Sequence, residues 1–186
     1  PSPPPPSQTS PMTSVPPAPP LGSMQCDVPL LAAALSSTLA AAFPASAIID
    51  GDMATVCATN ADVYNWASVR VAVGTPIAYV AVYNRIDSAE YQPLLSPFEI
   101  WVGVHFGDTS SASAFRCAEM VVPSGPGPFM APCYSVTSGA YVTVRQVGAA
   151  RYLTITEVKV CSGTRSPSLP GLPSSPSPLH TFTSVI

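Results

Sequence analysis

The sequence alternates between apolar and polar residues in several short runs, and this pattern predicts β-strands. Residues 98–104 place Phe98, Ile100, Val102 and Val104 at every second position, which is typical of a strand with one buried face. Similar runs, rich in β-branched and aromatic residues, occur at residues 69–73, 77–83, 117–122, 141–146 and 151–161. This density of short strands and turns predicts an all-β sandwich.

One segment fits another interpretation. The alanine-rich residues 30–42 could form a helix on local grounds, and residues 28–49 are apolar enough to raise the question of a membrane span. Ser36, Ser37 and Pro44 interrupt the segment, and no basic flank follows it. The sequence therefore predicts no transmembrane span.

A charged motif, NRID at residues 84–87, follows the run at residues 77–83. Pro93 and Pro97 exclude a regular helix through the rest of this connection. Charged side chains on the loops of a rigid β scaffold are frequent binding sites. The loop that begins at residue 84 is therefore a first candidate site.

Proline is concentrated at the two ends of the chain. Residues 1–20 and 167–178 are rich in it, whereas the segment between the first and last cysteines has a more ordinary composition. Because proline lacks an amide donor and fixes φ, these ends favour extended polyproline II, with a disordered linker as the alternative. We divide the chain into an arm of residues 1–25, one domain of residues 26–162 and an arm of residues 163–186.

The composition limits the possible partners. Only 9% of the 186 residues are charged, and the formal net charge is −3, which argues against nucleic acid or an anionic membrane surface. The chain opens on Pro1 without a basic region, so it shows no signal peptide and is either a mature product or an excerpt of a longer chain.

The five cysteines favour disulfides over a metal site. None forms a CxxC pair and the chain has two histidines, which argues against structural zinc. Cys26 and Cys161 bracket the domain, and Cys117 and Cys133 flank a loop rich in proline and glycine. Cys57 has no assigned partner. It is either a buried free thiol, or forms a disulfide with another chain, or forms a disulfide with one of the four other cysteines in place of the pairs above. The pattern favours an oxidising, extracellular setting.

Two further features carry possible chemistry. Asp50 and Asp52 flank Gly51, and this spacing allows both carboxylates to face one hard cation, although Asp-Gly is also a common turn. We interpret Trp66 as a core anchor rather than a sugar platform.

Catalysis is not expected. His105 is the one histidine of residues 26–162, which leaves no Ser-His-Asp or Cys-His set. Glu90 and Glu99 lie in sequence contexts that offer no reason for a shifted pKa.

Several motifs occur in an order that is found in a known family. They are LSST at residues 35–38, PASAIIDGD at residues 44–52, Trp66 followed by Val69 and Ile77, VYNRID at residues 82–87, IWVG at residues 100–103, GAYV at residues 139–142 and LTITEV at residues 153–158. Together they resemble the F-type lectin (fucolectin) branch of the galactose-binding-like, discoidin-type β-sandwich. The resemblance implies a jelly-roll sandwich, an extended chain at residues 30–42 and a disulfide between Cys117 and Cys133.

The resemblance also implies a structural calcium ion. Its ligands, transferred position by position, are Asp50, Asp52, Thr55 and Glu157. The alternative is that Asp50 and Glu157 simply accept hydrogen bonds from backbone amides.

The sugar site of the family is incompletely matched. Arg85 keeps one arginine and Asp87 its acidic partner, but Gln92 stands near the second arginine. The histidine position falls at Ala58 or Thr59, and Ser88-Ala89 replaces a Cys-Cys pair. A single arginine does not supply the family's fork of charged hydrogen bonds, so we expect no fucose binding in this mode and favour Arg85–Asp87 as a structural ion pair.

The Pro-Pro and Ser-Pro runs resemble the hydroxyproline-rich glycoproteins of plant and green-algal walls and surfaces. This resemblance implies prolyl hydroxylation and O-linked glycans. The candidate positions are Ser2, Pro3, Pro4, Pro5, Pro6 and Ser7.

The sequence thus predicts a non-catalytic, extracellular interaction module of a fibrous or matrix assembly on a cell wall or ciliary surface. Its partners would be other chains and their O-linked glycans. The alternative is a calcium-dependent lectin with altered, non-fucose specificity. The candidate contacts of the interaction module are Tyr64, Tyr91, Gln92, Phe106 and Phe129.

Overall fold

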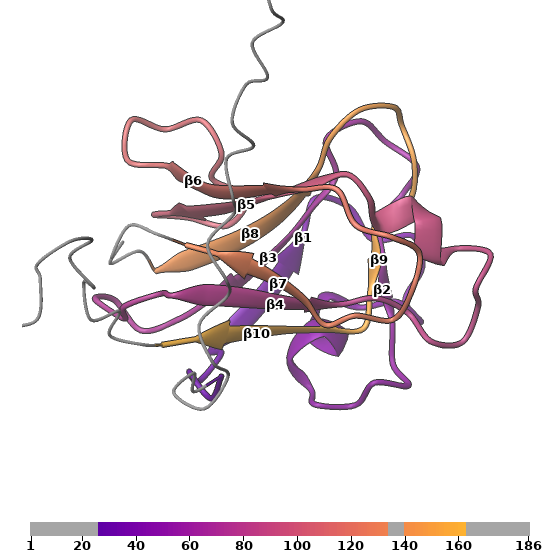
Figure 1. Cartoon of the computed structure of the whole chain (residues 1–186), viewed down its shortest axis with the longest axis horizontal. Helices are drawn as coiled ribbons and strands as arrows, with labels where there is room; N and C mark the ends of the chain where they lie inside the picture. Colours follow the sequence, from indigo (N-terminus) through magenta and orange to yellow (C-terminus); the bar gives the residue numbers. More distant parts are fainter. Residues whose placement is uncertain (1–25, 134–139, 163–186) are drawn as a thin grey trace, which may run out of the picture.

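The computed structural model describes residues 26–133 and 140–162. The arms and their candidate glycosylation positions lie outside the described residues. The domain consists of antiparallel strands arranged as two facing sheets with a small third pair (Figure 1). The predicted all-β sandwich is confirmed.

The larger sheet has five strands. Their spatial order is β1 (Ala32–Leu35), β3 (Trp66–Arg70), β8 (Tyr141–Gln146), β5 (Phe98–Gly103) and β6 (Phe115–Met120). Every pairing is antiparallel, and a β-bulge interrupts β5–β6 at Ile100/Trp101.

The second sheet has three strands and faces the first (Figure 1). Its order is β10 (Glu157–Cys161), β4 (Tyr79–Tyr83) and β7 (Phe129–Pro132), and a separate pair joins β2 (Cys57–Ala58) to β9 (Thr154–Ile155). Two short 3₁₀ helices, η2 (Ala45–Ile49) and η3 (Gln92–Leu95), lie in the connections.

The core lies between the sheets because each strand turns alternate residues inward. Phe98, Ile100 and Val102 of β5 are at most 2% exposed, as the alternation predicts. Each such side chain contributes about 1.5–3 kcal/mol by leaving water. The prediction was wrong at the strand ends: Val73 is 87% and Val104 57% exposed, because β3 ends at Arg70 and β5 at Gly103.

The extended chain that the family resemblance implies at residues 30–42 is confirmed. The segment contains β1 and no helix, because Ala33 and Leu35 pack against the core as part of the sheet edge. Other local expectations are corrected. Pro93 lies within η3, where the first turn of a short 3₁₀ helix tolerates proline. Strand β7, which ends the proline- and glycine-rich loop, was not predicted. No helix among the described residues is long and apolar enough to cross a membrane.

The structure contains the disulfides Cys26–Cys161 and Cys117–Cys133. The first joins the start of the domain to β10, and the second joins β6 to the residue after β7. Cys57 is a free thiol with no exposed surface in β2, which matches the first of the three alternatives.

Candidate functional site

The NRID motif forms a fixed turn at the end of β4. Asn84 is fully buried, and its side-chain amide donates to the carbonyls of Gln92 and Gly125 at 2.9 and 3.0 Å. Its carbonyl oxygen Oδ1 accepts from the Arg85 amide at 3.0 Å. Asn84 therefore holds three separate loop segments together and sets the direction of the arginine that follows it.

Arg85 makes a two-pronged ion pair with Asp87. Nε and Nη2 lie 2.7 and 2.6 Å from the two carboxylate oxygens, and the guanidinium lies 4.7 Å from the centre of the Tyr91 ring. The hydrogen bond between them raises the pKa of Arg85 and lowers the pKa of Asp87. The side chains are 13% and 49% exposed, so Asp87 is the member of the pair that faces solvent.

Asp87 also borders a cavity of about 390 Å³. Phe43, Pro44 and Val56 supply apolar wall, whereas Asp50, Thr55 and Asp87 supply oxygen atoms. A pocket of this size with apolar walls and a few fixed polar groups is typical of small-ligand sites. Asp50 and Thr55 come from the turn between η2 and β2, whereas Asp87 comes from the NRID loop, and the structure brings the two loops to one cavity.

The positions that correspond to the family's histidine and second arginine do not face this cavity. Ala58 and Thr59 are buried, and the Thr59 hydroxyl donates to the Asn60 carbonyl and accepts from the Leu153 amide. The Gln92 amide donates to the Arg85 carbonyl at 3.1 Å. These hydrogen bonds assign both side chains to the support of the loops.

The acidic turn lies against the last strand. Gly51 has a φ of +78°, which suits glycine, and its amide donates to Glu157 Oε2 at 2.9 Å. Asp50 accepts hydrogen bonds from the Asp52 amide and the Thr55 hydroxyl, and Asp52 accepts from the Ala54 amide. The predicted calcium ligands are thus neighbours, and most of their hydrogen bonds stabilise the turn itself.

The donor set only partly suits calcium. Asp50 and Glu157 border a shared cavity of about 270 Å³, and burial raises the pKa of Glu157, with the Asp50 charge adding to this effect. Both carboxylates offer the hard oxygens that calcium takes. However, no group of three His, Cys, Asp or Glu side chains suited to a metal occurs within residues 26–133 and 140–162.

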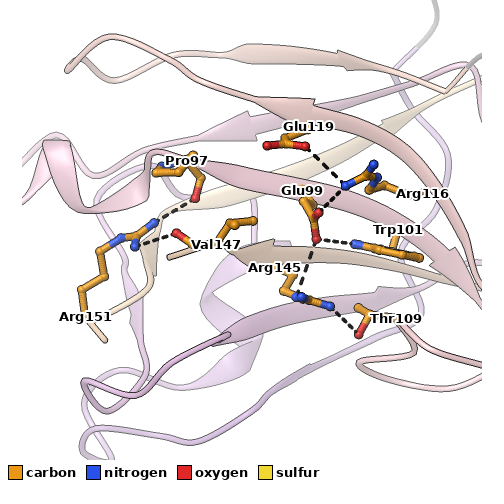
Figure 2. Close-up of polar contacts among 9 residues, drawn as sticks. All are labelled: Pro97, Glu99, Trp101, Thr109, Arg116, Glu119, Arg145, Val147 and Arg151. Atoms are coloured by element: carbon orange, nitrogen blue, oxygen red, sulfur yellow. Dashed lines mark hydrogen bonds and ion pairs between the residues drawn. The ribbon is translucent and has the colours of Figure 1, made fainter. Parts of the chain in front are cut away.

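A second polar cluster, which sequence reasoning missed, lies on the outer face of the five-stranded sheet (Figure 2). Glu99 accepts hydrogen bonds from Trp101 Nε1 at 2.8 Å and Arg116 Nη1 at 2.7 Å, and Arg145 Nε lies 3.6 Å away. Burial alone would raise the pKa of Glu99, but these donors and charges outweigh it, and the pKa is lowered. The expectation of an ordinary pKa for Glu99 was wrong, because the sequence near Glu99 does not show the two arginines that come from β6 and β8.

Trp66 belongs to this same face rather than to the core, which corrects the interpretation as a core anchor. It pairs across the strands with Arg145, and the Gly107 backbone lies directly against its indole ring. Of the other proposed contacts, Phe106 packs edge-on against Tyr141 at 4.8 Å, and Phe129 packs against the core.

The chain is similar in structure to several solved carbohydrate-binding modules. One is a histidine mutant of the lectin-binding domain of lectinolysin complexed with Lewis b, with a TM-score of 0.57 and 23% identity over 72% of this chain and 92% of that one. A family 32 carbohydrate-binding module of C. perfringens NanJ, in complex with galactose, has a TM-score of 0.59 and 17% identity over 70% and 93%.

A serum fucolectin of Morone saxatilis (striped bass) has a TM-score of 0.58 and 23% identity over 71% of this chain. This chain covers 46% of that protein's length. No protein-family model matches the sequence, and no curated protein matches it. The structural similarities show that the domain has the galactose-binding-like β-sandwich fold that the sequence motifs predicted.

Proposed function

We propose that the domain is a non-catalytic, extracellular carbohydrate-binding module. The observation that carries the proposal is the cavity beside Asp87, in which the Phe43 ring meets oxygen atoms from two separate loops. An aromatic ring packs against the apolar face of a sugar, and the carboxylates of Asp50 and Asp87 accept hydrogen bonds from its hydroxyl groups. The similar lectin and galactose-binding modules support this class of ligand.

The proposed ligand is a neutral sugar other than fucose, and it binds in a way that differs from the fucose site of the F-type lectin family. Two carboxylates border the cavity, so an acidic sugar would be repelled. Arg85 positions Asp87 and leaves part of its guanidinium free, but Thr59 and Gln92 are committed to backbone contacts. The specificity therefore differs from a site built on one histidine and two arginines.

A glycan array of the full chain tests this function. The wild type should bind a set of neutral glycans reproducibly, and Asp87→Ala should weaken binding about tenfold or more, since a hydrogen bond to a charged group contributes about 1.5–3 kcal/mol. Arg116→Ala is the matched control, because it removes an ion-paired cation from the outer face of the sheet. An array without signal, or equal loss in both variants, would contradict the proposal.

A second proposed role is that of an interaction module in a hydroxyproline-rich assembly of a wall or ciliary surface. The proline-rich ends of the chain favour it. Mass spectrometry of the native protein should find hydroxyproline and O-linked pentose or hexose at Pro3–Pro6 and the adjacent serines. Unmodified peptides throughout residues 1–20 would remove the basis for this role.

We also propose a structural calcium ion beside the acidic turn, held by the carboxylates of Asp50 and Glu157, with Asp52 and the Thr55 hydroxyl as further ligands. Calcium would relieve the repulsion between the two carboxylates and tie the turn to β10. Saturating calcium should therefore raise the melting temperature of the full chain, and a chelator should reverse this rise. Magnesium should raise the melting temperature only weakly. Unchanged unfolding in calcium and chelator would exclude this ion.

A further inference from the structure

The outer face of the five-stranded sheet carries an unusual set of side chains for a surface. Strand register places Trp66, Arg145 and Glu99 side by side across β3, β8 and β5, and Trp101 in the next row. The chain has two tryptophans, and both are in this set. We call the following residues the aromatic–arginine face: Tyr64, Trp66, Trp101, Arg116, Tyr141 and Arg145.

The centre of this face is built around Arg145. Its guanidinium lies 4.8 Å from the centre of the Tyr64 ring and 5.9 Å from that of Trp101, and Nη1 donates to the Thr109 hydroxyl. Tyr64 has a φ of +56°, the one positive value at a non-glycine among the described residues, and it is 55% exposed. A strained backbone that holds an aromatic ring toward solvent points to a binding role.

The charges of the face cancel locally. Arg116 and Arg145 lie beside Glu99, and Arg116 also lies 3.3 Å from Glu119 (Figure 2). The Glu99 carboxylate is already used by Trp101 and the two arginines. What the face offers to a ligand is therefore aromatic surface and hydrogen-bond donors, namely the Tyr64 hydroxyl and the free nitrogens of the half-exposed Arg116.

This chemistry complements one segment of the same chain. Ten of residues 1–20 are proline and none is charged. A proline-rich segment in polyproline II presents carbonyl acceptors without internal hydrogen bonds, and its rings pack well between aromatic side chains. We propose that residues 1–20, from the same chain or a second copy, dock in polyproline II form on the aromatic–arginine face.

A short segment can reach across the centre of the face. The two distances to Arg145 limit the separation of the Tyr64 and Trp101 ring centres to about 11 Å at most, so a few residues of polyproline II, which rises ~3.1 Å per residue, are long enough to contact both rings. Twenty such residues span about 60 Å, whereas a domain of this size has a radius of gyration of about 14 Å. The segment is therefore long enough to reach the face of its own domain or of a neighbour.

Photo-crosslinking of the full chain tests the proposal directly. The chain is produced without glycans in a bacterial periplasm, with Tyr64→p-benzoyl-Phe as the crosslinking variant. Mass spectrometry should place the crosslinks within residues 1–20, in monomers or in dimers. The matched control is Tyr91→p-benzoyl-Phe, which labels the exposed ring beside Arg85. Crosslinks from Tyr64 that miss residues 1–20, or equal labelling of this segment from Tyr91, would overturn the proposal.

Tryptophan fluorescence gives a second test, because both tryptophans of the chain belong to this face. Acrylamide should quench the wild-type chain less than a variant in which the ten prolines of residues 1–20 are changed to alanine. Tyr64→Ala should remove this difference. Equal quenching of the wild type and the proline variant would overturn the proposal. Tryptophans that are protected from acrylamide only when a neutral oligosaccharide is added would overturn it as well. The outcome is independent of the sugar site, which lies on the loops beside Asp87.

Discussion

Glu99 has only 7% of its side chain exposed, although it lies on the solvent side of β5. The alternation of residues 98–104 correctly assigned Phe98 and Ile100 to the inside and Glu99 to the outside. It did not reveal the environment of Glu99, because Arg116 and Arg145 come from β6 and β8. Side-chain direction follows from the local sequence, whereas the partners depend on which strands pair.

Replacing Glu99 by glutamine keeps the shape and removes the charge that Arg116 and Arg145 share. Glu99→Gln should lower the free energy of unfolding at pH 7 by about 1–3 kcal/mol, as expected for lost hydrogen bonds to a charged group. The folded-state pKa of Glu99 lies below its unfolded value, so this stabilisation is present above the unfolded pKa of about 4.3 and is lost as the pH falls through the folded one.

Urea unfolding at pH 7 and at pH 3 measures this difference. The difference in the free energy of unfolding between the wild type and Glu99→Gln should be smaller at pH 3 than at pH 7. Glu119→Gln is the control, since this side chain is 53% exposed, and it should stay within about 0.5 kcal/mol of the wild type. A gap that widens in acid would contradict the account of Glu99.

Cys57 illustrates a residue whose state the sequence left open among three alternatives. Burial raises the pKa of its thiol to about 12, so almost no thiolate forms at pH 8. Iodoacetamide should modify Cys57 only after unfolding in urea, as mass spectrometry of the native and unfolded chain would show. Rapid modification of the native chain, or a disulfide from Cys57 to another chain, would show that the thiol is accessible.

At the scale of elements, the periodicity located most strands but not their partners. The strands before and after the NRID loop, β4 and β5, lie in different sheets, and β3 pairs with β8 over a long separation. The same limit applies to the loop after β5. Its Asp108 is 1% exposed and accepts hydrogen bonds from Val104 and Ser111, which folds the loop back onto the sheet.

This fold-back depends on Gly107. A Cβ atom at this position would overlap the Trp66 ring, and the φ of Gly107 is +68°. Gly74 has a similar φ of +84° with open space around it, so Gly74→Ala measures the backbone cost alone. Gly107→Ala should cost about 1–3 kcal/mol more, the range found for overpacking, and should change tryptophan emission. Equal melting temperatures and spectra for the two variants would show that the loop does not press on Trp66.

At the scale of the whole molecule, the order of motifs predicted the fold because each motif marks a strand or a turn at a fixed place in the sandwich. The candidate sugar cavity was only partly predictable. Asp50 and Asp87 were identified from their motifs, but Phe43 and Val56 were not, since apolar loop residues have no distinctive local pattern. They join the site because the fold brings their loops together.

The central claim is that the domain binds a neutral glycan in the cavity beside Asp87. The most direct measurement is the amide NMR spectrum of the isotope-labelled full chain, recorded with millimolar galactose-containing neutral oligosaccharides. A sugar bound in this cavity should cause saturable shifts at residues 42–47, 54–56 and 84–92, and Asp87→Ala should abolish these shifts while preserving the rest of the spectrum. An unchanged spectrum, or shifts confined to the region around Trp101 and Arg145, would contradict it.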